Sequence, residues 1–122
     1  MTEQVAERPE ALVDERPWGR FERLALNETV TVKVITVEPG HRLSLQRHTT
    51  RDESWQILDA GLYVEIDGRR WSPAVGEQVW IPRGVTHRVG NEGTASARFL
   101  EVAYGWFDED DIERIEDDYS RS

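Results

Sequence analysis

The sequence predicts an all-β fold, a small jelly-roll barrel (double-stranded β-helix), for a single domain. Short runs rich in β-branched and aromatic residues recur along the chain, about eight or nine in number. Turn residues such as Gly, Pro, Asn and Asp separate these runs at intervals of about 8 to 12 residues. Regular short strands of this kind close into antiparallel barrels, whose interior can hold a metal and a small ligand.

Length and composition narrow the class of protein. At 122 residues the chain can form one hydrophobic core but not two. Its net charge of −9 argues against nucleic acid or an anionic membrane as a partner. There is no cysteine, so neither disulfides nor thiolate metal ligands are available. No apolar run approaches the roughly 20 residues of a membrane span, and the N-terminus lacks a signal pattern, so we expect a cytoplasmic protein.

The chain divides into an N-terminal arm and one domain of short strands. Residues 1–15 are acidic and weakly apolar, and we expect a flexible N-terminal arm there, followed by one domain over residues 16–122. Strands are expected over residues 20–24, 30–37, 43–48, 55–58, 62–66, 70–71, 79–81 and 96–104. Asp67-Gly68 predicts a two-residue hairpin turn between two of them.

The C-terminal segment shows a different pattern. Four acidic residues at 108–111 suit the start of a helix, and Ile112 and Ile115 would share one helical face with Tyr119 close to it. We therefore expect a short helix over residues 108–119, docked on the outside of the barrel.

Four polar residues in two distant stretches are candidates for a metal site. Side chains two apart on a strand face the same way, so Gln46 and His48 can point to one place. Glu53 can return from the following turn as an oxygen ligand, and His87 can supply a second imidazole from a remote strand. This donor set suits one divalent ion such as zinc, manganese, iron, cobalt or nickel better than calcium, and we expect zinc first.

Turn residues around these ligands have a recognisable spacing. Glycine, five residues, Pro-x-Gly, two residues, His, three residues, Asn is the second signature of the cupin superfamily, and it is complete from Gly76 to Asn91. The stretch from Gly40 to Gly61 resembles the first cupin signature. Gln46 stands where that signature usually has a histidine, which points to a subfamily.

Longer motifs run from about residue 16 to residue 121. They are Arg16-Pro17-Trp18-Gly19, Leu43-Ser44-Leu45-Gln46-x-His48, Arg51-x-Glu53-x-Trp55, Ile81-Pro82-x-Gly84-Val85-x-His87-Arg88 and Glu109-Asp110-Asp111-Ile112-x-Arg114-x-Glu116-Asp117-x-Tyr119. Together they resemble the type II mannose-6-phosphate isomerase domain, an RmlC-like cupin that often forms the C-terminal part of bifunctional mannose-1-phosphate guanylyltransferases. The sequence has no Gly-rich nucleotide loop, so we do not expect nucleotidyl transfer.

The resemblance implies a metal-dependent isomerase that interconverts mannose 6-phosphate and fructose 6-phosphate through a cis-enediol, in polysaccharide or GDP-mannose synthesis. The metal would be held by Gln46, His48, Glu53 and His87. The base is open between Lys33, which has the strand parity of Ile35 and Val37 and so would enter the barrel, and Glu101 on the last strand. Guanidinium groups that bind the sugar phosphate are expected from Arg51, Arg88, Arg20 and Arg98. We also expect Arg51 to take part in catalysis.

This sequence also departs from the family pattern. Thr49, Thr50 and Ser54 stand where the family usually has histidines. Two alternatives therefore remain: a metal-binding cupin with other chemistry, such as a dioxygenase or a sugar-epimerase-like enzyme, and a non-catalytic sugar-binding cupin. We also expect a homodimer in which the N-terminal arm crosses to a neighbour.

Overall fold

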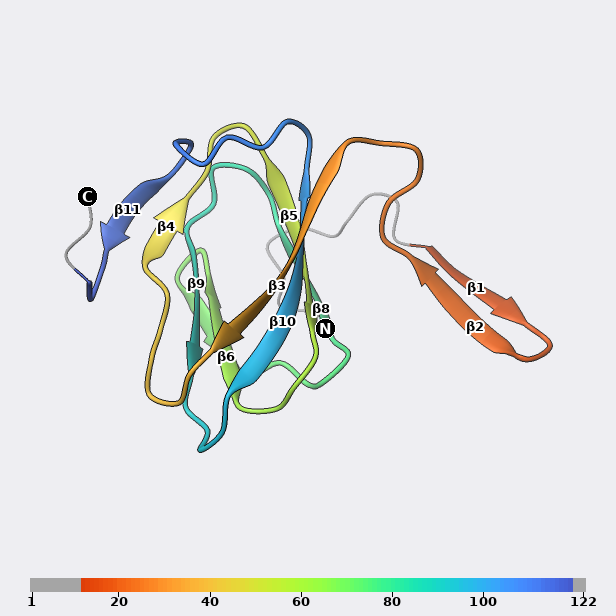
Figure 1. Ribbon diagram of the computed structural model, residues 1–122, viewed down its shortest axis with the longest axis horizontal. Helices are drawn as coiled ribbons and strands as arrows, with labels where there is room; N and C mark the ends of the chain where they lie inside the picture. Colours follow the sequence, from red (N-terminus) through yellow and green to blue (C-terminus); the bar gives the residue numbers. More distant parts are fainter. Residues whose placement is uncertain (1–11, 120–122) are drawn as a thin grey trace.

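The computed structural model describes residues 12–119, and within that range every regular element is a strand (Figure 1). One sheet has the strand order β3 (Val30–Val37), β10 (Ala97–Tyr104), β5 (Asp52–Ile57) and β8 (Gln78–Ile81). The other has the order β11 (Glu113–Glu116), β4 (Leu45–Arg47), β9 (His87–Asn91), β6 (Leu62–Ile66) and β7 (Arg69–Trp71). The predicted all-β jelly-roll architecture is confirmed.

The core lies between these two sheets. Trp55, Ile57 and Phe99 come from the four-stranded sheet, and Val64 and Val89 come from the five-stranded one. All five are buried, and the Trp55 and Phe99 rings lie 5.2 Å apart. Burial of this apolar surface is the main stabilising term of the fold, and it leaves one end of the barrel to polar side chains.

The hairpin between β6 and β7 follows from two residues. Asp67 and Gly68 both have positive φ, 52° and 79°, which is the backbone of a type I′ turn. This turn matches the right-handed twist of the strands it joins, so the prediction from Asp67-Gly68 is confirmed.

The predicted C-terminal helix is wrong. After a turn at Asp108–Asp111 the chain forms strand β11, which pairs antiparallel with β4. Ile112 and Arg114 are partly covered, while Glu113 and Ile115, which alternate with them, are exposed, as expected for a strand. The edge of β4 offers unpaired backbone groups, and pairing with them outweighs the weak helical preference of an acidic segment.

The N-terminal part begins with a hairpin of β1 (Leu12–Arg16) and β2 (Gly19–Arg23), which projects from the barrel (Figure 1). Residues 1–11 of the predicted arm lie outside the described residues, and residues 12–15 lie in β1. Within residues 12–119 there is no helix long and apolar enough to cross a bilayer. The predicted cytoplasmic location stays a prediction.

Candidate metal centre and cavity

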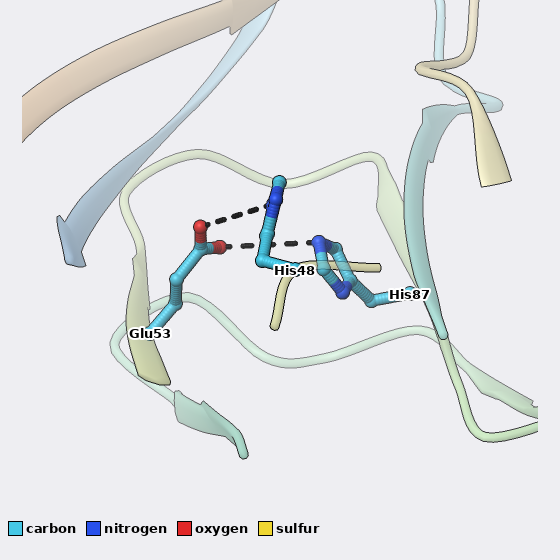
Figure 2. Close-up of side chains that lie close together, drawn as sticks. All are labelled: His48, Glu53 and His87. Carbon is cyan, nitrogen blue, oxygen red and sulfur yellow. Dashed lines mark ion pairs between the residues drawn. The ribbon is translucent and has the colours of Figure 1, made fainter. Parts of the chain in front are cut away.

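Three of the four predicted metal ligands converge at one end of the barrel (Figure 2). His48 follows β4, Glu53 lies on β5, and His87 begins β9. The Nε2 atom of His48 lies 3.4 Å from one Glu53 carboxylate oxygen, and the Nε2 atom of His87 lies 4.0 Å from the other. All three residues are buried, and one ligand atom from each lies within 4.8 Å of the others.

Backbone carbonyls orient both imidazoles. The Nδ1 atom of His48 lies 2.6 Å from the carbonyl oxygen of Asp111, and that of His87 lies 3.0 Å from the carbonyl of Val85. A carbonyl only accepts hydrogen bonds, so Nδ1 carries the proton and Nε2 bears the lone pair that can bind a cation. Burial lowers the pKa of both histidines and keeps the rings neutral, the form in which imidazole binds metals.

The donor set fits a divalent cation. The Nε2 atom of His87 is buried and has no hydrogen-bond partner among the described residues, although a buried acceptor of this kind is normally satisfied. Burial acts to raise the pKa of Glu53, whereas the positive charge of Arg51 and the hydrogen bond that it donates act to lower it. Two neutral imidazoles and one carboxylate are the protein ligands of many zinc sites.

Arg51 contacts a carboxylate oxygen of Glu53 and the Nε2 atom of His48, two of the candidate ligand atoms. Its Nε donates to Glu53 at 3.0 Å, and its Nη2 lies 3.1 Å from Nε2 of His48. A third nitrogen, Nη1, donates to the carbonyl of Asp108, and the guanidinium lies over the Phe107 ring. Arg51 therefore supplies the positive charge beside Glu53 in this structure, and its predicted phosphate-binding and catalytic role stays a prediction.

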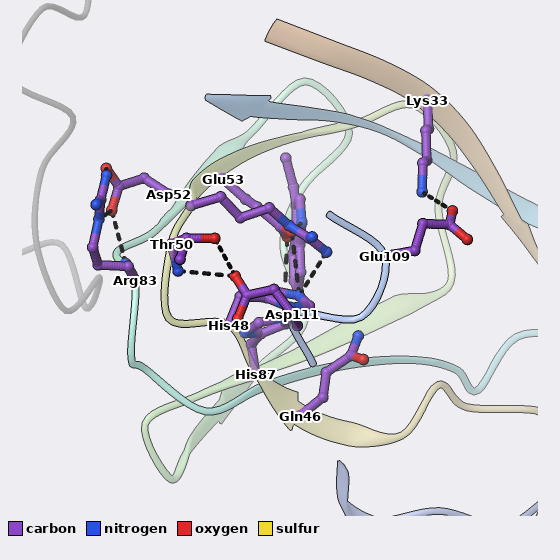
Figure 3. A network of polar contacts seen from close by, with 12 residues as sticks. Lys33, Gln46, His48, Thr50, Asp52, Glu53, Arg83, His87, Glu109 and Asp111 are labelled. Carbon is purple, nitrogen blue, oxygen red and sulfur yellow. Dashed lines mark hydrogen bonds and ion pairs between the residues drawn. The ribbon is translucent and has the colours of Figure 1, made fainter. Parts of the chain in front are cut away.

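Gln46 is placed next to the three converging residues (Figure 3). It lies on β4 directly opposite His87 on β9, so both side chains are on the same face of the sheet. The Ser44 hydroxyl donates to its amide oxygen at 3.3 Å, and Gln46 lines the cavity with His48. Its position suits a fourth ligand, a role that stays a prediction.

A cavity of about 230 Å³ opens beside the ligands. Both candidate bases contribute to its wall. Lys33 and Glu101 are cross-strand neighbours on β3 and β10. Glu101 is buried, and burial together with the nearby charge of Glu53 raises its pKa to about 7. The full lining is Lys33, Ile35, Leu43, Gln46, His48, Arg51, Glu101, Phe107, Glu109, Ile112 and Arg114.

Three arginines predicted for the phosphate lie elsewhere. Arg88 is buried but donates to the carbonyl of Leu43 and to Glu116 on the outer side of its sheet. Arg98 pairs with Asp59 on the surface, and Arg20 lies exposed on the projecting hairpin. None of the three is among the described residues that line the cavity. Their roles stay predictions without support from this geometry.

Sequence reasoning missed the cavity residues of the C-terminal segment, which are Phe107, Glu109, Ile112 and Arg114. The helix expected there would have docked outside the barrel. Their place in the cavity depends on the pairing of β11 with β4, which no local pattern in the sequence shows.

The departures from the family pattern also have defined places. The backbone N–H groups and hydroxyls of Thr49 and Thr50 donate to the Asp111 carboxylate, which fastens the C-terminal segment beside the site. Ser54 is buried opposite Trp80 and Val102 on the outer face of its sheet. None of the three side chains lines the cavity.

A larger groove of about 480 Å³ lies along β3, between Ile35 and Tyr119. Its lining includes His41 and Arg42, both of which pair with the C-terminal segment. Among the described residues the convergent His, Glu and His group lies at the smaller cavity, so we place the site there.

Comparison with known proteins identifies the family of this chain. Residues 6–117 match the family model of the mannose-6-phosphate isomerase C-terminal domain. The chain belongs to this family. The alginate biosynthesis protein AlgA of Pseudomonas aeruginosa is 38% identical over 108 residues, and the mannose-1-phosphate guanylyltransferase of Escherichia coli is 37% identical over 107. These matches cover 88% and 87% of the chain but only 22% of each relative, so this family member spans about a fifth of their length.

Solved structures show the same fold. The capsular polysaccharide assembling protein CapF of Staphylococcus aureus has a TM-score of 0.65 at 20% identity, with 88% of this chain and 34% of that one covered. A sugar phosphate isomerase from the cupin superfamily of Silicibacter pomeroyi has a TM-score of 0.58 at 26% identity, with 71% and 59% covered. The family member described here is thus a cupin.

Proposed function

We propose that this chain is a metal-dependent sugar-phosphate isomerase that interconverts mannose 6-phosphate and fructose 6-phosphate. The observation that carries the proposal is the convergence of His48, Glu53 and His87 beside a cavity that also contains a buried carboxyl group, Glu101. Membership of the mannose-6-phosphate isomerase C-terminal family supports the substrate class.

His48, Glu53 and His87, with Gln46 as fourth ligand, would hold one divalent ion, for which zinc is our first choice. The bound ion would supply positive charge to the carbonyl and hydroxyl oxygens of the sugar as negative charge develops on them. The residues around it keep this end of the cavity dry, since all three convergent side chains are buried and electrostatic interactions are stronger away from water.

Glu101 is the better placed of the two candidate bases. It is buried and close enough to Glu53 for the two carboxyl groups to interact, whereas the Lys33 side chain is 38% exposed and its ammonium lies near Phe107 and Glu109. The isomerisation moves one proton between C1 and C2 through a cis-enediol, while a second proton moves between O1 and O2. In our proposal Glu101 removes the carbon-bound proton from one carbon and returns it to the other.

The names of the relatives suggest the biosynthetic pathway in which the enzyme acts. Their names refer to alginate and xanthan biosynthesis and to mannose-1-phosphate guanylyltransferase. We therefore assign the isomerase to polysaccharide or GDP-mannose synthesis. The homodimer, and the absence of nucleic-acid and membrane partners, remain parts of the proposal.

A coupled assay tests the reaction. Mannose 6-phosphate is supplied to the chain loaded with zinc, cobalt or manganese, and fructose 6-phosphate is measured. We expect turnover with at least one metal, loss of turnover with a chelator, and recovery when metal is added back. A chain that binds metal but gives no fructose 6-phosphate with any of the three would refute the proposal.

A further inference from the structure

One row of side chains crosses three strands of the five-stranded sheet. Arg114 on β11 lies opposite Gln46 on β4, and Gln46 lies opposite His87 on β9. Directly opposed residues in antiparallel strands share a face, so Arg114 belongs to the same inner row as the two predicted ligands. Two strand spacings separate the backbones of Arg114 and His87, about 10 Å.

A second cation faces this row from the other sheet. Lys33 on β3 is the cross-strand neighbour of Glu101 and lines the cavity with Arg114. Its ammonium lies 4.3 Å from the centre of the Phe107 ring and 3.8 Å from a carboxylate oxygen of Glu109 (Figure 3). The Glu109 side chain is 81% exposed, and an exposed pair at this distance is weak.

The charges of the cavity differ between its two ends. Glu101 lines the cavity and is buried, and the Glu53 carboxyl group close to it is buried as well. Lys33, partly exposed, marks the end that is open to solvent. A phosphate dianion is repelled by the buried Glu53 and Glu101 carboxylates, whose charge Arg51 offsets in part, and is attracted by Lys33 and Arg114, whereas uncharged sugar oxygens are not repelled.

We propose that Arg114 and Lys33 form the subsite for the terminal phosphate of the substrate, and that this phosphate displaces Glu109 from Lys33. The inference rests on the proposed function and gives the substrate its direction, with the reacting end toward Glu101 and the phosphate at the mouth. The Arg51 guanidinium donates to Glu53 and to the carbonyl of Asp108, so we assign it to the ligands and not to the phosphate.

The subsite is tested with inorganic phosphate as the probe. Binding is measured by calorimetry in the presence of a chelator, so that phosphate cannot bind through a metal. Arg114→Gln should weaken phosphate binding roughly tenfold or more, since it removes a charge-assisted hydrogen bond. Glu109→Gln should strengthen it several-fold, because it removes the competing carboxylate.

A matched control is Arg83→Gln, which removes the same charge from a surface pair with Asp52 and should leave phosphate binding unchanged. Glu109 is so exposed that its replacement is not expected to disturb folding. The proposal is overturned when Glu109→Gln binds phosphate no more tightly than the parent, or when folded Arg114→Gln binds it equally well.

Kinetics then separate this inference from the proposed function. When the parent isomerises mannose 6-phosphate and Arg114→Gln has an unchanged KM, the subsite is wrong and the isomerase stands. When phosphate binding responds as expected but no metal gives turnover, the subsite stands and the isomerase is wrong. Success of both requires a KM raised roughly tenfold or more in Arg114→Gln with a smaller change in kcat.

Discussion

The Asp111 carboxylate holds the C-terminal segment against the site, and its replacement by asparagine is the first prediction. It accepts hydrogen bonds from the backbone N–H groups of Thr49 and Thr50, both at 2.9 Å, and from both hydroxyls. Its backbone carbonyl lies against Nδ1 of His48. Asp111→Asn keeps the shape but puts an NH₂ group in place of one oxygen that accepts two of these bonds.

The expected loss in the free energy of unfolding follows from the two hydrogen bonds that Asp111→Asn removes. Two charge-assisted hydrogen bonds would be worth about 3 to 6 kcal/mol if they were fully buried and additive. Asp111 is only partly covered, so water can replace part of what is lost, and we expect a loss of about 1 to 2 kcal/mol. Chemical denaturation measures the free energy of unfolding, and hydrogen exchange over residues 107–116 should show faster opening.

The same carboxylate predicts a pH dependence. Partial burial acts to raise its pKa, but the hydrogen bonds from Thr50 and Thr49 outweigh this and hold the pKa below the ordinary value of 3.8. A lowered pKa in the folded state gives stability that is complete above the unfolded value and is lost as the pH falls through the folded value. The difference between parent and variant should thus be full at pH 7 and shrink below about pH 4.

Asp110→Asn is the control, because it removes the same charge from the neighbouring residue, whose side chain is exposed. The reasoning fails when Asp111→Asn is within about 0.5 kcal/mol of the parent at pH 7, the range of ordinary surface substitutions. It also fails when Asp110→Asn costs as much.

Three further predictions concern the metal centre. His87→Ala should lose bound metal by elemental analysis, while His41→Ala, which changes a histidine in the groove along β3, should keep it; equal metal in both would contradict the ligand assignment. Glu101→Gln should lower kcat roughly 10²- to 10⁴-fold with metal content unchanged, and a kcat near the parent's would exclude it as the base. Arg51→Met should bind metal roughly tenfold or more tightly by competition with a chromophoric chelator, because its guanidinium holds two ligand atoms; weaker binding would show that Arg51 supports the ligands instead.

Most of the barrel could be predicted from local chemistry. β-branched runs, turn residues and the Asp67-Gly68 pair act over a few residues, and their effects do not depend on distant parts of the chain. The i, i+2 spacing of Gln46 and His48 likewise fixes a common face. The convergence of His87 on this face could be expected only because two cupin signatures occur together.

The C-terminal strand could not be predicted in this way. Ile112 and Ile115 are compatible with a helical face, and only the free edge of β4 decides between the two periods. That edge is more than 60 residues away in sequence, where Arg47 lies opposite Glu113. Tertiary pairing therefore overrode the local preference.

Strand parity explains where two of the arginines point. Neighbouring residues on a strand face opposite sides, so a cavity-facing His87 requires Arg88 to point away. In the same way Phe99 and Glu101 face inward, which turns Arg98 outward toward Asp59. Strand parity therefore places the side chains of Arg88 on β9 and Arg98 on β10 outside the cavity.

The same parity explains why the departures from the family pattern leave the ligand set intact. Glu53 faces inward, so Ser54 faces outward, and a histidine at that position would also lie outside the cavity. Thr49 and Thr50 hold Asp111, whose carbonyl orients His48. In our proposal both histidines at the site bind the ion, and the third histidine of the chain, His41, lies in the groove along β3, so the proton transfer requires a carboxylate or a lysine.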